Sequence, residues 1–276
     1  MPLFVNSKPV ASFNFPGGEC SVNVSDVTTG DRVEVLAYLY TSDDIMQLLL
    51  TVNAIRIVNP DASVHLTVPY FPYARQDRVC NVGEAFSLQV MASLVNSLGC
   101  ESVTVVDPHS AKTMELLQRA REITQMAILR ASVVEALIRS KNLLLLAPDK
   151  GAVPKLRAYQ SDLAERGVHV DVECCHKVRD PKTGQILRTE VPELNPDRGV
   201  LIVDDICDGG RTFVEIAKVI KERGRNTLYL YVTHGIFSKG FEPLKDFQQI
   251  FCYHTFRKPN AEEAQLVTTI GDVYVD

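Results

Sequence analysis

Apolar runs of strand length alternate with helix-type patterns along most of this chain. Apolar residues recur at helical spacing within 45–55, 85–98, 153–166 and 212–223, and Thr41 or Ser42 is available to cap the first of these helices. Candidate strands lie between them at 33–40, 64–69, 102–106, 143–147, 168–174, 200–203, 227–232 and 250–253. Repeated strand–helix–strand order is typical of parallel sheets covered by helices on both faces. The sequence therefore predicts an α/β fold of doubly wound parallel sheets.

Strand–helix units of this kind occur on both sides of residues 139–142. A chain of 276 residues is long enough for one large or two ordinary domains. We therefore expect two similar α/β domains, over residues 1–141 and 142–276. The segment 177–198 is polar, contains three prolines and lacks clear periodicity, which favours a long loop or a hairpin with an exposed tip.

Composition limits the classes of partner that the chain can have. Apolar residues make up 46% and charged residues 23%, which is ordinary for a protein with a substantial core. The formal net charge of −5 gives no basic surface for nucleic acid or for an anionic membrane. The seven cysteines lack metal-site spacing, which indicates free thiols in a reducing compartment. With no apolar run of membrane-spanning length, we expect a cytoplasmic protein that binds neither nucleic acid nor membrane.

The residues after the apolar run at 200–203 suit a sugar phosphate. Two carboxylates, Asp204 and Asp205, come first, and carboxylates bind hydroxyl groups or a hard metal ion. A glycine-containing loop then opens into a helix, so backbone N–H groups and the positive end of the helix dipole face one point. The loop residues are Asp208, Gly209, Gly210, Arg211 and Thr212. An ordinary strand–turn–helix joint remains the alternative, because Asp and Gly are common turn residues.

This loop resembles the phosphoribosyl-diphosphate (PRPP) loop of type I phosphoribosyltransferases and PRPP synthetases. In those families two acidic residues hold the ribose hydroxyls, and the small residues that follow hold the 5-phosphate. The resemblance implies that Asp204, Asp205 and residues 208–212 bind ribose 5-phosphate. Gly209 stands where the families usually have Thr, and Arg211 replaces a small residue or Lys.

A second segment, Pro-Tyr-Phe-Pro-Tyr-Ala-Arg-Gln-Asp-Arg at residues 69–78, is rich in aromatic and guanidinium groups. By composition alone, a surface salt-bridge cluster explains it as well as a nucleotide site does. The string resembles the Pro-Tyr-x-x-Tyr-Ala-Arg-Gln-Asp segment of PRPP synthetases, which contacts ATP and is absent from ordinary phosphoribosyltransferases. The resemblance therefore favours the synthetases and implies that Arg75, Gln76 and Asp77 bind ATP.

Near the N-terminus, Phe-Asn-Phe-Pro-Gly-Gly-Glu at residues 13–19 predicts a Gly-Gly hairpin between the segments 11–15 and 20–24. It also resembles the synthetases' Phe-Ser-Asp-Gly-Glu adenine-binding loop, which implies that Phe15 and Glu19 contact ATP. Gly17 replaces the Asp that usually recognises the adenine amino group. A site without that polar group discriminates weakly, so the nucleotide donor stays open.

Three further motifs occur in the order found in the synthetases. Asp-Pro-His-Ser at 107–110 resembles a family motif whose His helps hold Mg²⁺ near the triphosphate, and Pro-Asp-Lys-Gly at 148–151 resembles one whose Asp belongs to the metal and ribose end of the site. The resemblance implies Mg²⁺ ligation by His109 and Asp149, with His109 also beside ATP. Lys177-Val-Arg179 resembles the Lys-x-Arg of the mobile catalytic loop, which implies that both cations stabilise the transferring group. Without the family, these residues would be ordinary loop or surface groups.

Together the motifs resemble a PRPP synthetase, also called a ribose-phosphate diphosphokinase. The resemblance implies two type I phosphoribosyltransferase-like halves, a homo-oligomer, and Mg²⁺-dependent transfer of the β,γ-diphosphoryl group of ATP to the 1-hydroxyl of ribose 5-phosphate, which yields PRPP and AMP. Three alternatives remain: a phosphoribosyltransferase that consumes PRPP, a catalytically silent regulatory relative, and a synthetase that uses another nucleotide.

Overall fold

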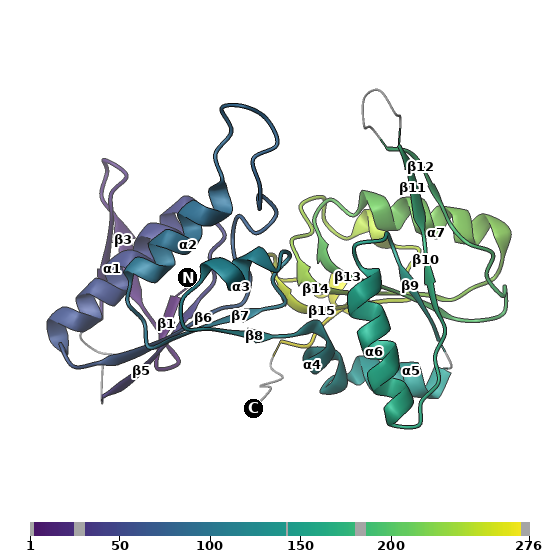
Figure 1. Cartoon of the computed structure of the whole chain (residues 1–276), viewed down its shortest axis with the longest axis horizontal. Helices are drawn as coiled ribbons and strands as arrows, with labels where there is room; N and C mark the ends of the chain where they lie inside the picture. Colours follow the sequence, from purple (N-terminus) through teal and green to yellow (C-terminus); the bar gives the residue numbers. More distant parts are fainter. Residues whose placement is uncertain (1–2, 25–30, 142, 180–185, 272–276) are drawn as a thin grey trace. The chain divides into compact units, whose positions relative to one another are not determined.

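The computed structural model describes residues 3–24, 31–141, 143–179 and 186–271. It divides into two compact units, Met1–Ile123 and Thr124–Asp276, seen in Figure 1. The boundary therefore lies before the expected position at 141/142. The short helices α4 (Gln125–Arg130) and α5 (Val133–Lys141) contact each other, and α4 also contacts α6 (Val153–Glu165), so this segment packs with the C-terminal unit.

The N-terminal unit is built on a six-stranded sheet of order β2-β1-β5-β6-β7-β8. The strands β5 (Arg32–Ala37), β6 (Ser63–Val68), β7 (Ser102–Val106) and β8 (Ala120–Ile123) run parallel, while β1 (Leu3–Val5) is antiparallel to both β2 (Lys8–Pro9) and β5. Along the chain, the parallel strands are connected through the helices α1 (Ser42–Val58), α2 (Ser87–Ser97) and α3 (Lys112–Leu116). The predicted parallel α/β architecture is confirmed.

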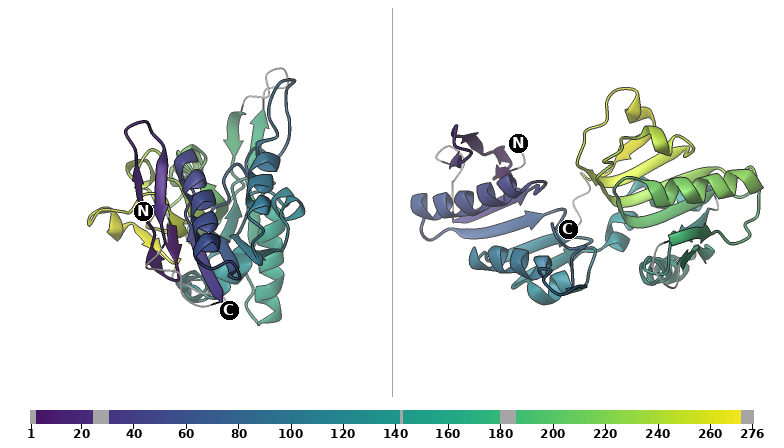
Figure 2. Two further views of the ribbon diagram at one scale, coloured as in Figure 1. Left: turned by 90° about the vertical axis from the view of Figure 1, so that its left-hand side faces the viewer. Right: turned by 90° about the horizontal axis from the view of Figure 1, so that it is seen from above.

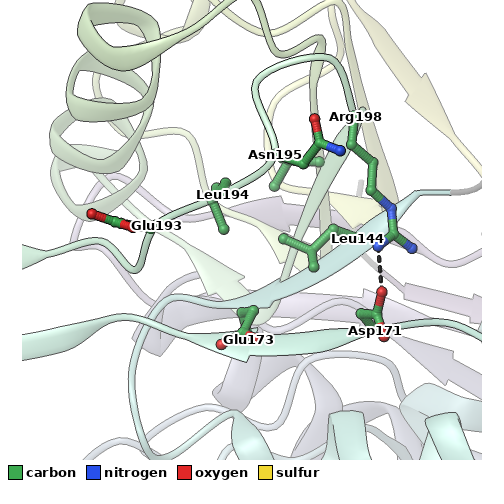
Figure 3. Close-up of a pocket in the computed structure, with 8 residues that line it drawn as sticks. Leu144, Asp171, Glu173, Glu193, Leu194, Asn195 and Arg198 are labelled. Carbon is green, nitrogen blue, oxygen red and sulfur yellow. Dashed lines mark hydrogen bonds and ion pairs between the residues drawn. The ribbon is translucent and has the colours of Figure 1, made fainter.

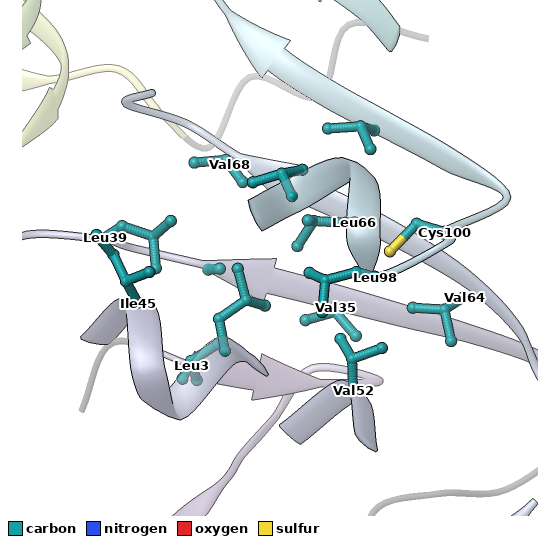
Figure 4. Packing of buried hydrophobic residues seen from close by; sticks show 14 of the residues in the cluster. Leu3, Val35, Leu39, Ile45, Val52, Val64, Leu66, Val68, Leu98 and Cys100 are labelled. Atoms are coloured by element: carbon teal, nitrogen blue, oxygen red, sulfur yellow. The ribbon is translucent and has the colours of Figure 1, made fainter. Parts of the chain in front are cut away.

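Helix α1 forms where the sequence provides both a cap and an apolar face. The Thr41 hydroxyl accepts a hydrogen bond from the Asp44 amide at 3.2 Å, and the Asp44 carboxylate accepts one from the Thr41 amide at 2.8 Å. This reciprocal pairing satisfies amides that the first helical turn leaves free. The inner face of α1 meets alternate residues of β5 and β6 in the core, which Figure 4 shows with Ile45, Val52 and Val35 among its members.

The C-terminal unit has a six-stranded sheet of order β10-β9-β13-β14-β15-β16, in which all pairs are parallel. Its strands are β9 (Leu144–Ala147), β10 (Val172–Cys174), β13 (Val200–Cys207), β14 (Leu228–Gly235), β15 (Gln249–Thr255) and β16 (Val267–Thr269). The other elements are α6, α7 (Arg211–Arg223) and the 3₁₀ turns η1 (Glu242–Leu244) and η2 (Glu263–Gln265). The chain passes from β9 to β10 on one side and then to β13 on the other, so strand order reverses beside β9.

Two antiparallel hairpins accompany these sheets. The Gly-Gly hairpin is confirmed as β3 (Ala11–Asn14) and β4 (Cys20–Asn23), and β4 lies beside α1, as Figure 2 shows. The polar segment forms the hairpin β11 (His176–Arg179) and β12 (Ile186–Glu190), whose intervening residues lie outside the described part of the chain. None of the described helices combines the length and the apolar character needed to span a membrane.

Candidate active site

Two loops of the C-terminal unit flank the point at which strand order reverses. One follows β9 and carries Asp149, and the other follows β13 and carries residues 208–210. In open parallel sheets this position, beyond the carboxyl ends of the strands, is where ligands bind. The strand β13 is longer than the sequence predicted, because pairing with β14 continues through Asp204 and Ile206. The two acidic residues therefore lie in the C-terminal part of β13 and not in a loop.

The acidic residues of this region repel one another. Burial raises the pKa of the Asp204 carboxyl well above its ordinary value, and the neighbouring charges of Asp205 and Asp149 raise it further. The Asp205 amide donates a hydrogen bond to Asp204 Oδ1 at 2.9 Å, which opposes part of this rise. The influence of Asp149 on Asp204 indicates that the loops after β9 and β13 bring their carboxylates into one region. Such a region favours hydroxyl donors or a cation.

The loop at 208–212 is held by the segment that follows β14. The amides of Ile236 and Phe237 both donate to the Cys207 carbonyl, at 2.8 and 3.1 Å. The Ser238 hydroxyl donates to Asp208 Oδ1 at 2.7 Å, and its amide to the Asp208 carbonyl at 3.1 Å. Residues 236–238 therefore support this loop structurally.

Gly210 gives this loop its turn into α7. Its φ of +76° is in the left-handed region, where a side chain is unfavourable, and an added Cβ would lie 3.2 Å from a methyl group of Leu244. The helix has no side-chain hydrogen bond at its cap, so the positive end of its dipole is offered to a ligand. Arg211 forms an ion pair with Glu215 at 2.7 Å, with 85% of its side chain exposed. The guanidinium is thus accessible beside the loop.

A polar group that the sequence did not single out lies under the acidic residues. The Gln125 amide donates to the Asp204 carbonyl at 2.9 Å and to the Thr233 hydroxyl at 3.4 Å. Gln125 is only 5% exposed, at the start of α4. No local pattern marks it, because its partners are far away in the sequence.

The two candidate catalytic cations lie on the β11–β12 hairpin. In the strand register Lys177 is opposite Thr189, and Arg179 is opposite Ile186. The side chains of Lys177 and Arg179 lie outside the described part of the structure, so their role stays a prediction.

In the N-terminal unit, the segments after β6 and β7 meet at Asp77. Arg78 donates to the Asp77 carboxylate at 2.8 and 3.2 Å, and the Ser110 hydroxyl donates to it at 2.8 Å. The hydrogen bonds from Arg78 lower the pKa of Asp77 to about 2, with help from Ser110 and against the effect of burial. Since Ser110 follows His109, two of the predicted ATP-binding segments are brought together here.

The remaining predicted nucleotide residues are exposed. Arg75, Gln76 and His109 are all at the surface, and the Gln76 side chain accepts a hydrogen bond from Ser87 at 2.6 Å. Phe15 is 50% exposed, and its ring packs edge-on against Phe13 with centroids 4.8 Å apart.

The turn between β3 and β4 closes next to Phe15. The Phe15 amide donates to the carbonyl of Glu19, itself exposed, at 2.8 Å. The Asn14 side chain donates to Asp43 of α1 at 3.3 Å, which ties the hairpin to the helix.

A small pocket of about 100 Å³ lies elsewhere in the C-terminal unit (Figure 3). It includes Leu144 and Val200, which begin β9 and β13, and an ion pair between Arg198 and Asp171. It is therefore at the opposite end of these strands from Asp204. We assign it no part in the site.

Comparison with known proteins places this arrangement in a family. A sequence model described as the N-terminal domain of ribose phosphate pyrophosphokinase matches residues 3–99, and a phosphoribosyl transferase domain model matches residues 112–264. The ribose-phosphate pyrophosphokinase of Thermococcus kodakarensis is 32% identical over 239 residues, which cover 82% of this chain and 77% of the relative. The chain belongs to the ribose-phosphate pyrophosphokinase family.

Other members agree with this assignment. The ribose-phosphate pyrophosphokinase of Maricaulis maris is 31% identical over 82% of this chain and 71% of its own length. The crystal structure of phosphoribosylpyrophosphate synthetase from Mycobacterium smegmatis superposes with a TM-score of 0.73 at 19% identity, covering 95% of this chain and 85% of that protein. This similarity shows a shared fold, which confirms the predicted fold, and the sequence matches confirm the predicted family.

Proposed function

We propose that this member of the ribose-phosphate pyrophosphokinase family transfers the β,γ-diphosphoryl group of ATP to the 1-hydroxyl of ribose 5-phosphate. The products would be PRPP and AMP, with release of the hydroxyl proton. The observation that carries the proposal is the pairing of half-buried carboxylates with an uncapped helix start where strand order reverses. Family membership supports the same reaction, since the relatives bear its name.

Ribose 5-phosphate fits the C-terminal unit. Its hydroxyls would donate to Asp204 and Asp205, which relieves the repulsion that raises the Asp204 pKa. Its 5-phosphate would accept hydrogen bonds from the backbone of residues 208–212, stabilised by the α7 dipole. Arg211 would add a charged contact by turning away from Glu215.

The nucleotide fits the segments of the N-terminal unit. Exposed aromatic rings at Phe15 and Phe13 offer a surface on which a base can stack. Arg75, Gln76 and His109 would contact phosphate and ribose oxygens, with Glu19 beside the base. The low pKa of Asp77 keeps it anionic, so that it holds Arg78 in a fixed direction.

Mg²⁺ suits the oxygen-rich character of the site. This ion takes few protein ligands and binds mainly to water and substrate phosphates, so we propose His109 of the N-terminal unit and Asp149 of the C-terminal unit each as a candidate ligand. The bound ion would neutralise charge on the triphosphate. The field of Asp149 at Asp204 indicates a local excess of negative charge that a divalent cation would relieve.

The transfer itself would proceed by in-line attack. The 1-hydroxyl oxygen forms a bond to the β-phosphorus, while the bond from that phosphorus to the oxygen bridging to the α-phosphate breaks and AMP leaves. Charge grows on the transferring oxygens, so positioning and neutralisation supply most of the acceleration. Lys177 and Arg179 would provide the cations. We further propose that the protein is cytoplasmic and that it forms a homo-oligomer. Gel filtration with light scattering tests the oligomeric state.

The experiment incubates the chain with ribose 5-phosphate, Mg²⁺ and a panel of nucleoside triphosphates, and quantifies PRPP and nucleoside monophosphate. We expect equal amounts of both. Pyrophosphate release from PRPP and a base, without AMP, would instead identify a phosphoribosyltransferase. No reaction with any donor would favour the regulatory alternative.

The double variant Lys177→Ala with Arg179→Ala tests the hairpin. It should lower kcat by at least about 100-fold, because removing one preorganised charge or donor already costs about that much. Circular dichroism provides the check on folding. Undiminished PRPP formation by a folded variant would show that the hairpin assignment is wrong.

A further inference from the structure

A buried polar chain lies under the two acidic residues of the C-terminal unit. It runs from the Tyr231 hydroxyl to the Thr233 hydroxyl at 3.4 Å, then to the Gln125 amide at 3.4 Å, and then to the Asp204 carbonyl at 2.9 Å. Tyr231 and Thr233 are fully buried, and Gln125 is 5% exposed. Three elements, α4, β13 and β14, therefore meet through polar groups at the place where the acidic residues begin.

The peptide group that joins Asp204 to Asp205 is held at both ends. Gln125 binds its oxygen, and the carboxylate of Asp204 binds its N–H at 2.9 Å. A peptide group is planar, so fixing its oxygen fixes the direction of its N–H. That N–H in turn fixes the Asp204 carboxylate. Gln125 thus determines how the acidic residues are presented, although it touches neither carboxylate in these contacts.

We propose that Gln125 is a positioning residue for ribose 5-phosphate. It acts through the peptide between Asp204 and Asp205 and keeps the Asp204 carboxylate directed at the sugar hydroxyls. This inference rests on the proposed function, because it assigns ribose 5-phosphate to that site. Preorganised polar groups lose less free energy on binding than groups that must be ordered by the ligand.

The substitution Gln125→Met tests the inference, since Met has similar length but no amide donor. The matched control is Gln47→Met. Gln47 is also buried, 7% exposed, and its amide donates to Asp43 at 2.9 Å, but it lies in α1 of the N-terminal unit. Gln125→Met loses two hydrogen bonds and Gln47→Met loses one that is partly buried, so both should lower Tm.

Steady-state kinetics, with each substrate varied in turn, measures the KM for each substrate. A purely structural role of Gln125 would not change the KM for ribose 5-phosphate selectively. For Gln125→Met the KM for ribose 5-phosphate should rise about tenfold, as expected from the loss of the hydrogen bond to the Asp204 carbonyl, while the KM for ATP stays within about twofold. Gln47→Met should leave the KM for ribose 5-phosphate near that of the wild type. Thr233→Val should raise the ribose 5-phosphate KM less than Gln125→Met does, because the longer contact is the one removed.

Calorimetric titration of each protein with ribose 5-phosphate and Mg²⁺ separates this inference from the proposed reaction. Suppose that the wild type binds ribose 5-phosphate but forms no PRPP, and that Gln125→Met binds the sugar more weakly. That result supports the positioning role and refutes the diphosphokinase activity. An unchanged ribose 5-phosphate KM, an equal rise for ATP, or the same rise in Gln47→Met overturns the positioning role alone. A wild type that does not bind ribose 5-phosphate overturns both.

Discussion

The acidic residues of the two units have opposite electrostatic surroundings. In the C-terminal unit, Asp204 lies partly buried near Asp205 and Asp149, and its pKa is raised. In the N-terminal unit, Asp77 is bound by Arg78 and Ser110, and its pKa falls to about 2. The charge of Asp77 is neutralised by the protein itself. The charge of Asp204 is left for a ligand to neutralise. This difference agrees with our assignment of the sugar to the C-terminal unit and of the nucleotide to the N-terminal unit.

The largest expected effect comes from Asp204→Asn. The substitution keeps the shape of the side chain but removes a charge that would bind the ribose hydroxyls, so kcat/KM for ribose 5-phosphate should fall by about 100-fold or more. Initial rates of PRPP formation measure this. Asp171→Asn, at the opposite end of the strands and 68% exposed, is the matched control and should change the rate little. Equal losses in both variants would abolish the distinction drawn between these aspartates.

Asp77→Asn should have a smaller and different effect. It removes the charge of a residue that we propose to bind ATP and weakens its hold on Arg78, so the KM for ATP should rise about tenfold while that for ribose 5-phosphate stays unchanged. Two-substrate kinetics measure both constants. Asp61→Asn, an exposed aspartate of the same unit, is the control. If the KM for the sugar rose as much as that for ATP, the division of substrates between the units would be wrong.

The smallest effect concerns stability against pH. Because the folded-state pKa of Asp204 is raised, its stabilising contribution is complete below the unfolded value of about 3.9 and is lost as pH rises through the folded value. Asn is never charged, so the Tm of Asp204→Asn should rise relative to that of the wild type as pH increases above about 3.9.

Asp77→Asn sharpens this test. The lowered pKa of Asp77 gives stability that is present above about 3.9 and lost only as pH falls towards 2, so its Tm difference from the wild type should be constant from pH 5 to pH 8. Thermal melts across this range measure both variants. Parallel pH profiles would mean that the two carboxyls do not differ as described.

Sequence patterns predicted what depends on neighbouring residues. The strands, the Thr41 cap of α1 and the Gly-Gly hairpin all follow from local spacing, and each is present. The motifs located the loop that follows β13 in the same way. The short elements β8, β16 and α3–α5 were not predicted, because a few residues carry too little periodicity.

Gln125 shows the limit of such patterns most clearly. It is 79 residues from Asp204 and 108 from Thr233, and its importance arises only when α4 packs against the ends of β13 and β14. An isolated glutamine at the start of a short helix resembles any surface residue in the sequence. Its burial and its hydrogen bonds are properties of the folded chain alone.

The ion pair between Arg211 and Glu215 has a consequence for turnover. A phosphate that recruits Arg211 must compete with a carboxylate one helical turn away, and this lowers its affinity by only about twofold, since exposed pairs of this spacing are worth about 0.3–0.5 kcal/mol. The same carboxylate is available to take the arginine back when product leaves. If the loop binds the 5-phosphate as we propose, this exchangeable arginine would lower the affinity slightly and allow a highly charged product to leave faster.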